Sequence, residues 1–276
     1  MRLVSFLKNG LWWPAVQRDD RIVEINGTAS ASPHEILTSV LAGQPFNEGP
    51  AHDIAKVTLG LPIPHPGKIV CLGLNYVDHA KEGGNPIPDY PAVFLRATSS
   101  LIAHDQPLLR PACSDKFDYE AELAVVIGKT ARHVTEVSAL SHVFGYACFN
   151  DGSIRDYQRK STQWTIGKNF DGTGAFGPCV VSADELPAGA TGLRIACRYN
   201  GKTMQDGNTS DMIFSIARTI AILSEAMTLE PGDVIITGTP AGVGYARKPP
   251  VFLRAGDVSE VEIEGIGTLR NPVVDA

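Results

Sequence analysis

Glu120 and Glu122 stand two positions apart in the otherwise apolar stretch 119–128. If this stretch is a strand, Glu120 and Glu122 point to the same face, because successive side chains alternate between the two faces. Like charges among apolar residues are costly unless a counter-charge compensates them, and a divalent cation would do so. Asp151, at the end of another apolar run, is a third candidate ligand. The spacing alone leaves equally open an exposed strand edge, with Asp151 in a turn.

The three carboxylates together indicate which ion the site would take. Hard oxygen ligands favour Mg²⁺, Mn²⁺ or Ca²⁺ over Zn²⁺. Three monodentate carboxylates leave positions open on an octahedral ion. Those positions suit a small anionic substrate that chelates through two oxygens, such as a 2-oxo acid.

A histidine and a glutamate three residues apart form a candidate acid–base pair. His79 and Glu82 would be neighbours on a short helical turn, and a carboxylate beside an imidazole raises its basicity. Such a pair can activate water. The following Gly83 and Gly84 would let the turn move as a lid. An exposed helical ion pair explains the same spacing.

Cations and a glycine-rich loop supply candidate substrate contacts. Arg155 and Gln158 follow Asp151 on one helical face, and Lys168 lies between apolar and glycine-rich segments. Near a metal such groups would bind an anionic substrate oxygen, whereas the adjacent cations at 159 and 160 are expected to be surface charges. Thr239 lies in a glycine-rich loop that follows a predicted strand. The loop lacks the lysine of a P-loop, so it predicts a carboxylate cradle rather than a nucleotide site.

Composition excludes several classes of partner. The chain has 276 residues, a formal net charge of -6 and no basic block, which argues against nucleic acid. No apolar run is long enough to cross a membrane. The five cysteines are scattered without paired spacing, which is typical of free thiols in a reducing cytosol and predicts a cytoplasmic protein.

The elements that must position these residues are mostly strands. Residues 1–65 form a small N-terminal α+β unit, with a helix over Pro33–Leu41 capped by Ser32, and the proline-rich segment 61–67 ends it. For residues 66–276 the sequence predicts strands and one long helix, which begins at Ser210 or Asp211. Strands do not alternate with long helices, so we expect an α+β, mostly β fold of rolled or sandwiched sheets rather than a doubly wound one.

Taken together, the motifs are similar to those of the fumarylacetoacetate hydrolase superfamily. The resemblance covers about residues 68–274. The segments that carry it are 72–82, Tyr119-Glu-Ala-Glu122, 145–158, Gly167-Lys168, 232–244 and 256–267.

The resemblance implies a fold, a metal and a role for each candidate residue. It implies the family's mixed β-roll in a catalytic domain over 66–276, a homodimer, and one Mg²⁺ or Mn²⁺ per subunit. It assigns the ligand role to Glu120, Glu122 and Asp151. It assigns the dyad on a closing lid to His79 and Glu82, and it gives Lys168 and Arg155 the role of stabilising an enolate or binding the substrate's oxygens. It also implies that Gln158 lies nearby and that Thr239 contacts the substrate carboxylate.

Two departures from the family pattern bear on the substrate. Many members carry Phe-x-Lys-Pro where this chain has Phe94-Leu-Arg96-Ala97, which puts a role for position 96 in doubt. The segment Asn85–Tyr90 is an addition that would reshape the pocket.

The leading functional prediction is hydrolytic cleavage of a C–C bond. The substrate would be a small 1,3-dicarbonyl acid of the acylpyruvate or diketo-acid type, and the products pyruvate and a carboxylic acid. The same residues would equally serve an isomerase or tautomerase, such as a 2-hydroxyhepta-2,4-diene-1,7-dioate isomerase, or a decarboxylase of acids such as oxaloacetate. A more remote alternative is a non-catalytic module that binds metal or acidic metabolites.

Overall fold

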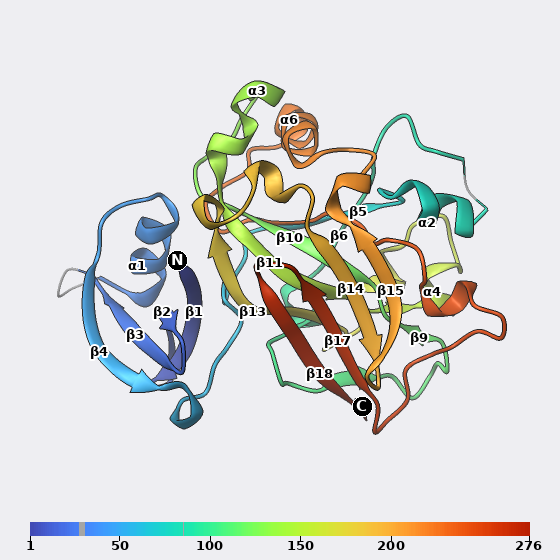
Figure 1. Cartoon of the computed structure of the whole chain (residues 1–276), viewed down its shortest axis with the longest axis horizontal. Helices are drawn as coiled ribbons and strands as arrows, with labels where there is room; N and C mark the ends of the chain where they lie inside the picture. Colours follow the sequence, from blue (N-terminus) through green and yellow to red (C-terminus); the bar gives the residue numbers. More distant parts are fainter. Residues whose placement is uncertain (28–30, 85) are drawn as a thin grey trace.

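The computed structural model describes residues 1–27, 31–84 and 86–276, and strands dominate it (Figure 1). Of the segment Asn85–Tyr90, Asn85 lies outside the described residues. The N-terminal part consists of four strands and a helix: β1 (Arg2–Lys8), β2 (Leu11–Arg18), β3 (Arg21–Asn26), α1 (Pro33–Leu41) and β4 (Asn47–Asp53). Helix α1 starts as predicted, because the Ser32 side chain accepts the amide of Glu35 and the Glu35 side chain accepts that of Ser32 in return.

An 11-stranded sheet runs through the molecule in the order β4-β3-β2-β1-β13-β11-β10-β16-β5-β6, with β7 paired to β13. Strand β1 hydrogen-bonds β13, so the sheet continues past residue 65, and a domain boundary there stays a prediction. The strands beyond the N-terminal part are β5 (Ile69–Gly73), β6 (Ala92–Leu95), β7 (Leu101–Ile102), β10 (Ala121–Ile127), β11 (Val143–Asp151), β13 (Gly174–Ser182) and β16 (Val234–Ile236).

A second sheet packs on one face of the first, in front of it in Figure 1. Its strands, in the order in which they pair, are β15 (Lys202–Asn208), β14 (Arg194–Tyr199), β17 (Val258–Ile263), β18 (Gly267–Asp275) and β8 (Leu108–Arg110). Asn200-Gly201, a residue pair typical of two-residue hairpin turns, joins β14 to β15, with φ values of 49° and 76°. A short pair, β9 (Phe117–Asp118) and β12 (Ser153–Ile154), lies beside the site.

Strand β10 is the central element, and every one of its residues is buried. Leu123 and Val125 belong to the core between the two sheets, whereas Ala124 and Val126 belong to the core on the opposite face. The predicted alternation is therefore confirmed, with apolar packing on both sides. The mostly-β α+β class that the sequence predicts is confirmed too.

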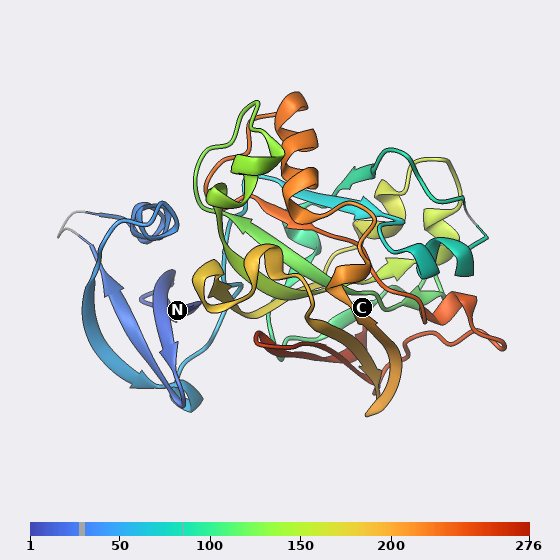
Figure 2. The same ribbon diagram turned by 45° about the horizontal axis from the view of Figure 1, so that its top comes forward.

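Short helices surround the sheets: α2 (Val77–Glu82), α3 (Glu136–Ala139), α4 (Arg155–Gln158), α5 (Thr165–Lys168) and α6 (Ile216–Ala226). Figure 2 shows α6 beside α3, away from the N-terminal part. The predicted start of α6 at Ser210 or Asp211 is wrong, because Ser215 caps the helix. The amide nitrogens of Ile213 and Phe214 instead donate to Asn75.

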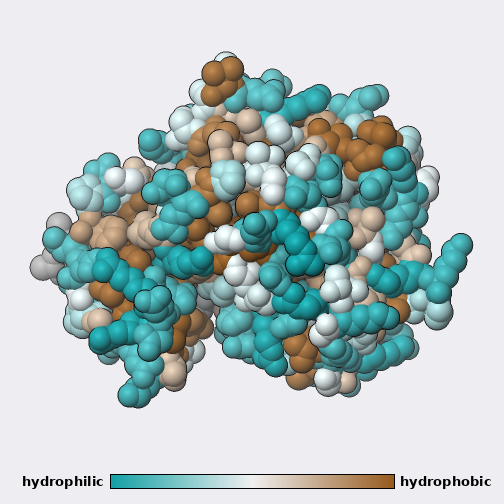
Figure 3. All heavy atoms as spheres, in the orientation of Figure 1, coloured by the Kyte–Doolittle hydropathy of each residue, from teal (hydrophilic) through white to brown (hydrophobic). Residues whose placement is uncertain are grey.

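The face seen in Figure 3 is largely hydrophilic, with apolar side chains gathered where the N-terminal part meets the rest. In the part of the chain that the structure describes, no helix has the length and apolar character needed to span a membrane.

Candidate metal centre and active site

The three predicted ligands meet at one point. Glu120 precedes β10, Glu122 lies on it, and Asp151 ends the adjacent strand β11. One carboxylate oxygen from each lies within 4.8 Å of the others, and the three residues are 1–3% exposed. Strand pairing explains the meeting, since Ala121 pairs with Asn150 and so places Glu120 beside Asp151. An exposed strand edge is therefore excluded.

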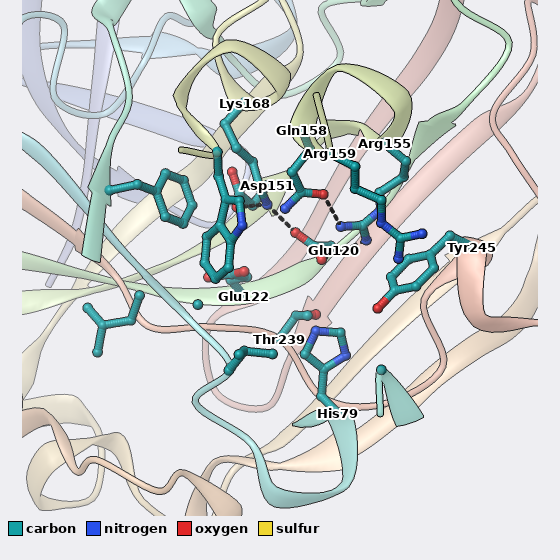
Figure 4. A pocket seen from close by; sticks show the side chains of 16 residues that line it. His79, Glu120, Glu122, Asp151, Arg155, Gln158, Arg159, Lys168, Thr239 and Tyr245 are labelled. Carbon is teal, nitrogen blue, oxygen red and sulfur yellow. Dashed lines mark hydrogen bonds and ion pairs between the residues drawn. The ribbon is translucent and has the colours of Figure 1, made fainter. Parts of the chain in front are cut away.

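Two of the predicted cations contact this carboxylate cluster directly (Figure 4). Lys168, from α5, donates to both Glu120 and Asp151. Arg155, from α4, donates to Glu120 at 2.7 Å and to Asp118 at 2.8 Å. Both cations are buried, so these ion pairs are poorly screened by solvent.

Arg96, whose role the sequence left in doubt, is a third buried cation of the cluster. Its guanidinium donates to the Asp151 carboxylate, to the Thr173 hydroxyl at 3.0 Å and to the Gly152 carbonyl at 3.3 Å. The Arg96 side chain has no exposed surface. Arg96 therefore orients a candidate metal ligand from behind and stays outside the substrate cavity.

The cluster remains short of positive charge. Among the described residues it holds four buried carboxylates (Asp118, Glu120, Glu122 and Asp151) against three buried cations (Arg96, Arg155 and Lys168). Burial, and then the charges of Asp151 and Glu120, raise the pKa of Glu122 well above its ordinary range. Burial would also raise the pKa of Glu120, but Arg155 and Lys168 outweigh it and lower that pKa. A divalent cation among the three ligands would correct the deficit, so these residues fit such an ion.

The candidate dyad lies on α2, whose His79 lines a cavity beside the carboxylate cluster. His79 is 6% exposed, and its Nδ1 lies 3.5 Å from Glu82 Oε2 without a hydrogen bond. The Glu82 carboxylate instead accepts the amide of Gly242 at 3.0 Å. The two side chains are neighbours, as predicted, but the carboxylate holds the helix against the Gly242 loop rather than orienting the imidazole.

The cavity has a volume of about 200 Å³ and unites most of the predicted residues. Gln158 lies in it and accepts a hydrogen bond of 2.9 Å from Arg155 through Oε1. The Thr239 hydroxyl is already engaged, since it donates to the Ala121 carbonyl and accepts from Gln205. The residues around the cavity are Leu72, Gly73, Leu74, His79, Gly83, Phe94, Glu120, Glu122, Asp151, Arg155, Gln158, Arg159, Trp164, Lys168, Thr239 and Tyr245.

Sequence reasoning missed three participants. Asp118 lies buried behind the cluster, where it accepts the amides of Gly244 and Tyr245 and so ties their loop to β9. Arg159 is exposed, as expected of a surface charge, but it also lines the cavity together with Tyr245. Only the position of Asp118 in the carboxylate-rich stretch 118–122 offered a signal.

The sheets, and a buried carboxylate cluster that can bind a divalent metal, are consistent with a known family of enzymes. The family model described as fumarylacetoacetate (FAA) hydrolase C-terminal matches residues 68–274, and the chain belongs to that family. The predicted resemblance is confirmed.

Among curated relatives, the chain is 45% identical over 222 residues to the human mitochondrial oxaloacetate tautomerase FAHD2A, covering 80% of this chain and 70% of that protein. A solved 2-hydroxyhepta-2,4-diene-1,7-dioate isomerase from Mycobacterium marinum has a TM-score of 0.82 at 32% identity, covering 100% and 98% of the two chains. A maleylpyruvate hydrolase from Sphingobium sp. SYK-6 has a TM-score of 0.81 at 30% identity, covering 100% of both.

These likenesses bear unequally on the functional predictions. An enzyme of this family, with an acidic triad that can bind a divalent metal, is supported. The tautomerase and isomerase relatives favour the alternative prediction, a tautomerase or isomerase, over the leading prediction of C–C bond hydrolysis.

Proposed function

We propose that this chain is a divalent-metal-dependent tautomerase of small 2-oxo acids, with oxaloacetate as the first substrate to test. The observation that carries the proposal is the cavity in which a cation-deficient carboxylate triad adjoins a fixed ammonium and a histidine. Similarity to oxaloacetate tautomerases supports the choice of substrate.

Glu120, Glu122 and Asp151 would hold the ion, and their hard oxygen donors favour Mg²⁺ or Mn²⁺. When bound, such an ion acts as a Lewis acid that polarises the 2-oxo group and favours enolisation.

Lys168 provides a permanent positive charge rather than a base. Burial would lower its pKa, but the charges of Asp151 and Glu120 outweigh burial and raise the pKa above its ordinary value. Its ammonium therefore stays protonated and stabilises negative charge that develops on the substrate oxygen. Arg155 adds a second donor on the same side, held in place by Asp118.

His79 would carry the proton, because Lys168 is held in ion pairs with Glu120 and Asp151 and arginine side chains keep their protons near neutral pH. Tautomerisation removes a proton from one substrate atom and adds one to another, and an imidazole can do both near neutral pH. The reaction needs no activated water, which suits a His79 whose Nδ1 donates no hydrogen bond to Glu82.

C–C hydrolysis is the second candidate. His79 and Glu82 are neighbours on α2, and a small rotation of either side chain would bring them into hydrogen-bonding distance. Catalytic hydrogen bonds are often long in ligand-free structures, and the likeness to a maleylpyruvate hydrolase supports this candidate.

The test is a product-resolved assay with Mg²⁺ or Mn²⁺. Enol-oxaloacetate should convert to the keto form faster with protein than without, and chelation should abolish the gain. Acylpyruvates, and oxaloacetate itself, should yield little pyruvate. The proposal fails if the enol–keto rate equals the buffer rate while an acylpyruvate is cleaved.

Variants of the dyad separate the two chemistries further. His79→Gln should remove tautomerisation, whereas Glu82→Gln should leave most of it. If Glu82→Gln abolishes turnover as completely as His79→Gln, the dyad acts as a unit and hydrolysis becomes the better assignment.

The predicted homodimer and cytoplasmic location remain part of this proposal. Light scattering of the purified protein would test the dimer.

A further inference from the structure

One end of the cavity carries a stacked arginine that the proposed mechanism does not use. Arg159 directly follows α4, and its guanidinium carbon lies 4.5 Å from the ring centroid of Tyr245. The guanidinium carbon of Arg155 also lies 4.5 Å from that centroid. The two guanidinium groups are therefore at most twice that distance apart, and Figure 4 shows them together beside Tyr245.

The cationic side chains that line the cavity differ in whether a carboxylate already neutralises their charge. Arg155 is paired with Asp118 and Glu120, and Lys168 with Glu120 and Asp151. Across the described ranges, no carboxylate forms an ion pair with Arg159. Arg159 is thus the cavity-lining cation that has its charge available for a ligand.

The apolar residues of the cavity come from other segments. Leu72 is on β5, Phe94 is on β6, and Trp164 precedes α5, with the rings of Phe94 and Trp164 packed edge to face. A substrate held at the carboxylate triad can therefore extend toward an apolar wall or toward a free guanidinium. The chemistry of its distal end decides which is favourable.

We propose that Arg159, stacked on Tyr245, binds the second carboxylate of the substrate, so that the site selects 2-oxo dicarboxylates over 2-oxo monocarboxylates. This inference rests on the proposed function, since it assumes that the first carboxylate and the 2-oxo group face the triad. The aromatic face holds the planar guanidinium while leaving its N–H groups free to donate to a carboxylate.

The test uses two ligands that differ only at the far end. Malate and 2-hydroxybutanoate share a four-carbon chain, a 2-hydroxyl and one carboxylate, but only malate carries a carboxylate at C4. Calorimetry with Mg²⁺ present should show that wild type prefers malate. Arg159→Gln should weaken malate binding roughly 10- to 100-fold, the worth of a charge-assisted hydrogen bond, and leave 2-hydroxybutanoate nearly unchanged.

The chain offers a matched control for the lost charge. Lys160 is the next residue, is exposed and does not line the cavity. Lys160→Gln removes the same unit of charge and should leave the malate preference intact. If Lys160→Gln and Arg159→Gln weaken malate binding equally, the effect comes from the net charge of the region rather than from a contact with Arg159, and the proposal is overturned.

Tyr245 provides a second variant that separates stacking from charge. Tyr245→Phe keeps the ring and should keep the preference, whereas Tyr245→Leu should reduce it with Arg159 still present. An unchanged preference in Arg159→Gln, or no measurable malate binding by wild type, would overturn the proposal.

Failure of the proposed function gives a different result. If wild type prefers malate through Arg159 but does not accelerate oxaloacetate tautomerisation, the dicarboxylate subsite stands and the reaction is another one. If tautomerisation is fast and Arg159→Gln leaves KM for oxaloacetate unchanged, the reaction stands and the subsite is wrong.

Discussion

Two buried carboxylate sites, the single Glu24 in the N-terminal strands and the group around Glu122 in the catalytic part, differ in how their charge is balanced. Glu24 is 2% exposed and accepts from Lys8 at 2.5 Å and from His52 at 2.7 Å. Burial would raise the pKa of Glu24, but these two hydrogen bonds outweigh it and lower the pKa.

The cluster around Glu122 lacks such balance. Glu122 itself accepts only a backbone amide, that of Gly238, among the hydrogen bonds of the described chain, and its neighbours Glu120 and Asp151 are also negative. Its pKa is raised rather than lowered. A buried carboxylate paired with its own basic partners is a structural feature. A group of buried carboxylates with too few cations around it indicates a site that binds a positively charged ligand.

The largest effect should come from neutralising the cation-deficient cluster. Glu122→Gln should lower turnover roughly 1,000-fold, because an ion that loses a ligand stabilises the enolate poorly. In the metal-free protein the same change should raise unfolding free energy by about 1 kcal/mol, since it removes like-charge repulsion.

The rate of oxaloacetate tautomerisation would measure the first effect, and thermal unfolding with and without Mn²⁺ would measure the second. Wild type should gain stability as Mn²⁺ is added, and Glu122→Gln should gain little. The control is Glu24→Gln, which should keep the full Mn²⁺ response. A metal-free Glu122→Gln protein that is less stable than wild type would contradict the charge comparison.

Arg96 should have the next largest effect, on metal affinity. Arg96→Lys keeps the charge behind Asp151, but one ammonium cannot replace the planar donors that reach Asp151, Thr173 and Gly152 together. We expect Mn²⁺ binding to weaken about 10- to 100-fold, as is typical when a partner of a metal ligand is lost.

Calorimetric titration of Mn²⁺ would measure this change. Arg194→Lys, which alters an exposed pair with Asp206, is the matched control and should bind Mn²⁺ as wild type does. Unchanged affinity in Arg96→Lys would show that Asp151 needs only a nearby charge.

The smallest effect should be the pH dependence of the stabilisation that Glu24 provides. Because the pKa of Glu24 is lowered in the folded state from an ordinary 4.5, its stabilisation is complete above that value. It is lost as pH falls through the lower folded pKa. Glu24→Gln should therefore cost about 1–3 kcal/mol at neutral pH, and the difference should vanish in acid.

Urea unfolding followed by tryptophan fluorescence would report this change, since Trp13 packs against Lys8. Glu48→Gln, at an exposed pair with Arg18, should show little difference at any pH. A Glu24→Gln deficit that persists in acid would mean that packing rather than charge explains the loss.

Local patterns in the sequence predicted much of the site. The two-residue spacing of Glu120 and Glu122 put both on one face, and the three-residue spacing of His79 and Glu82 made them neighbours on α2. Both depend on the geometry of a single element, which sequence order alone determines. The capped helix after Ser32 and the Asn200-Gly201 turn were predictable for the same reason.

Partners that are distant in sequence were decided only by the tertiary structure. Arg96 reaches Asp151 across 55 positions, and Asp118 reaches Gly244 across 126. Such contacts depend on which strands pair, and no local period encodes that choice. The start of α6 was missed likewise, because Asn75 takes the amide of Phe214.

The sequence by itself therefore determined which carboxylates share a face and which imidazole accompanies them. Only the folded chain decided how many cations reach that face, and that Arg159 beside Tyr245 forms no ion pair with any residue the structure describes. The physical reason is that charge balance is a sum over neighbours in space, and packing of the sheets selects those neighbours.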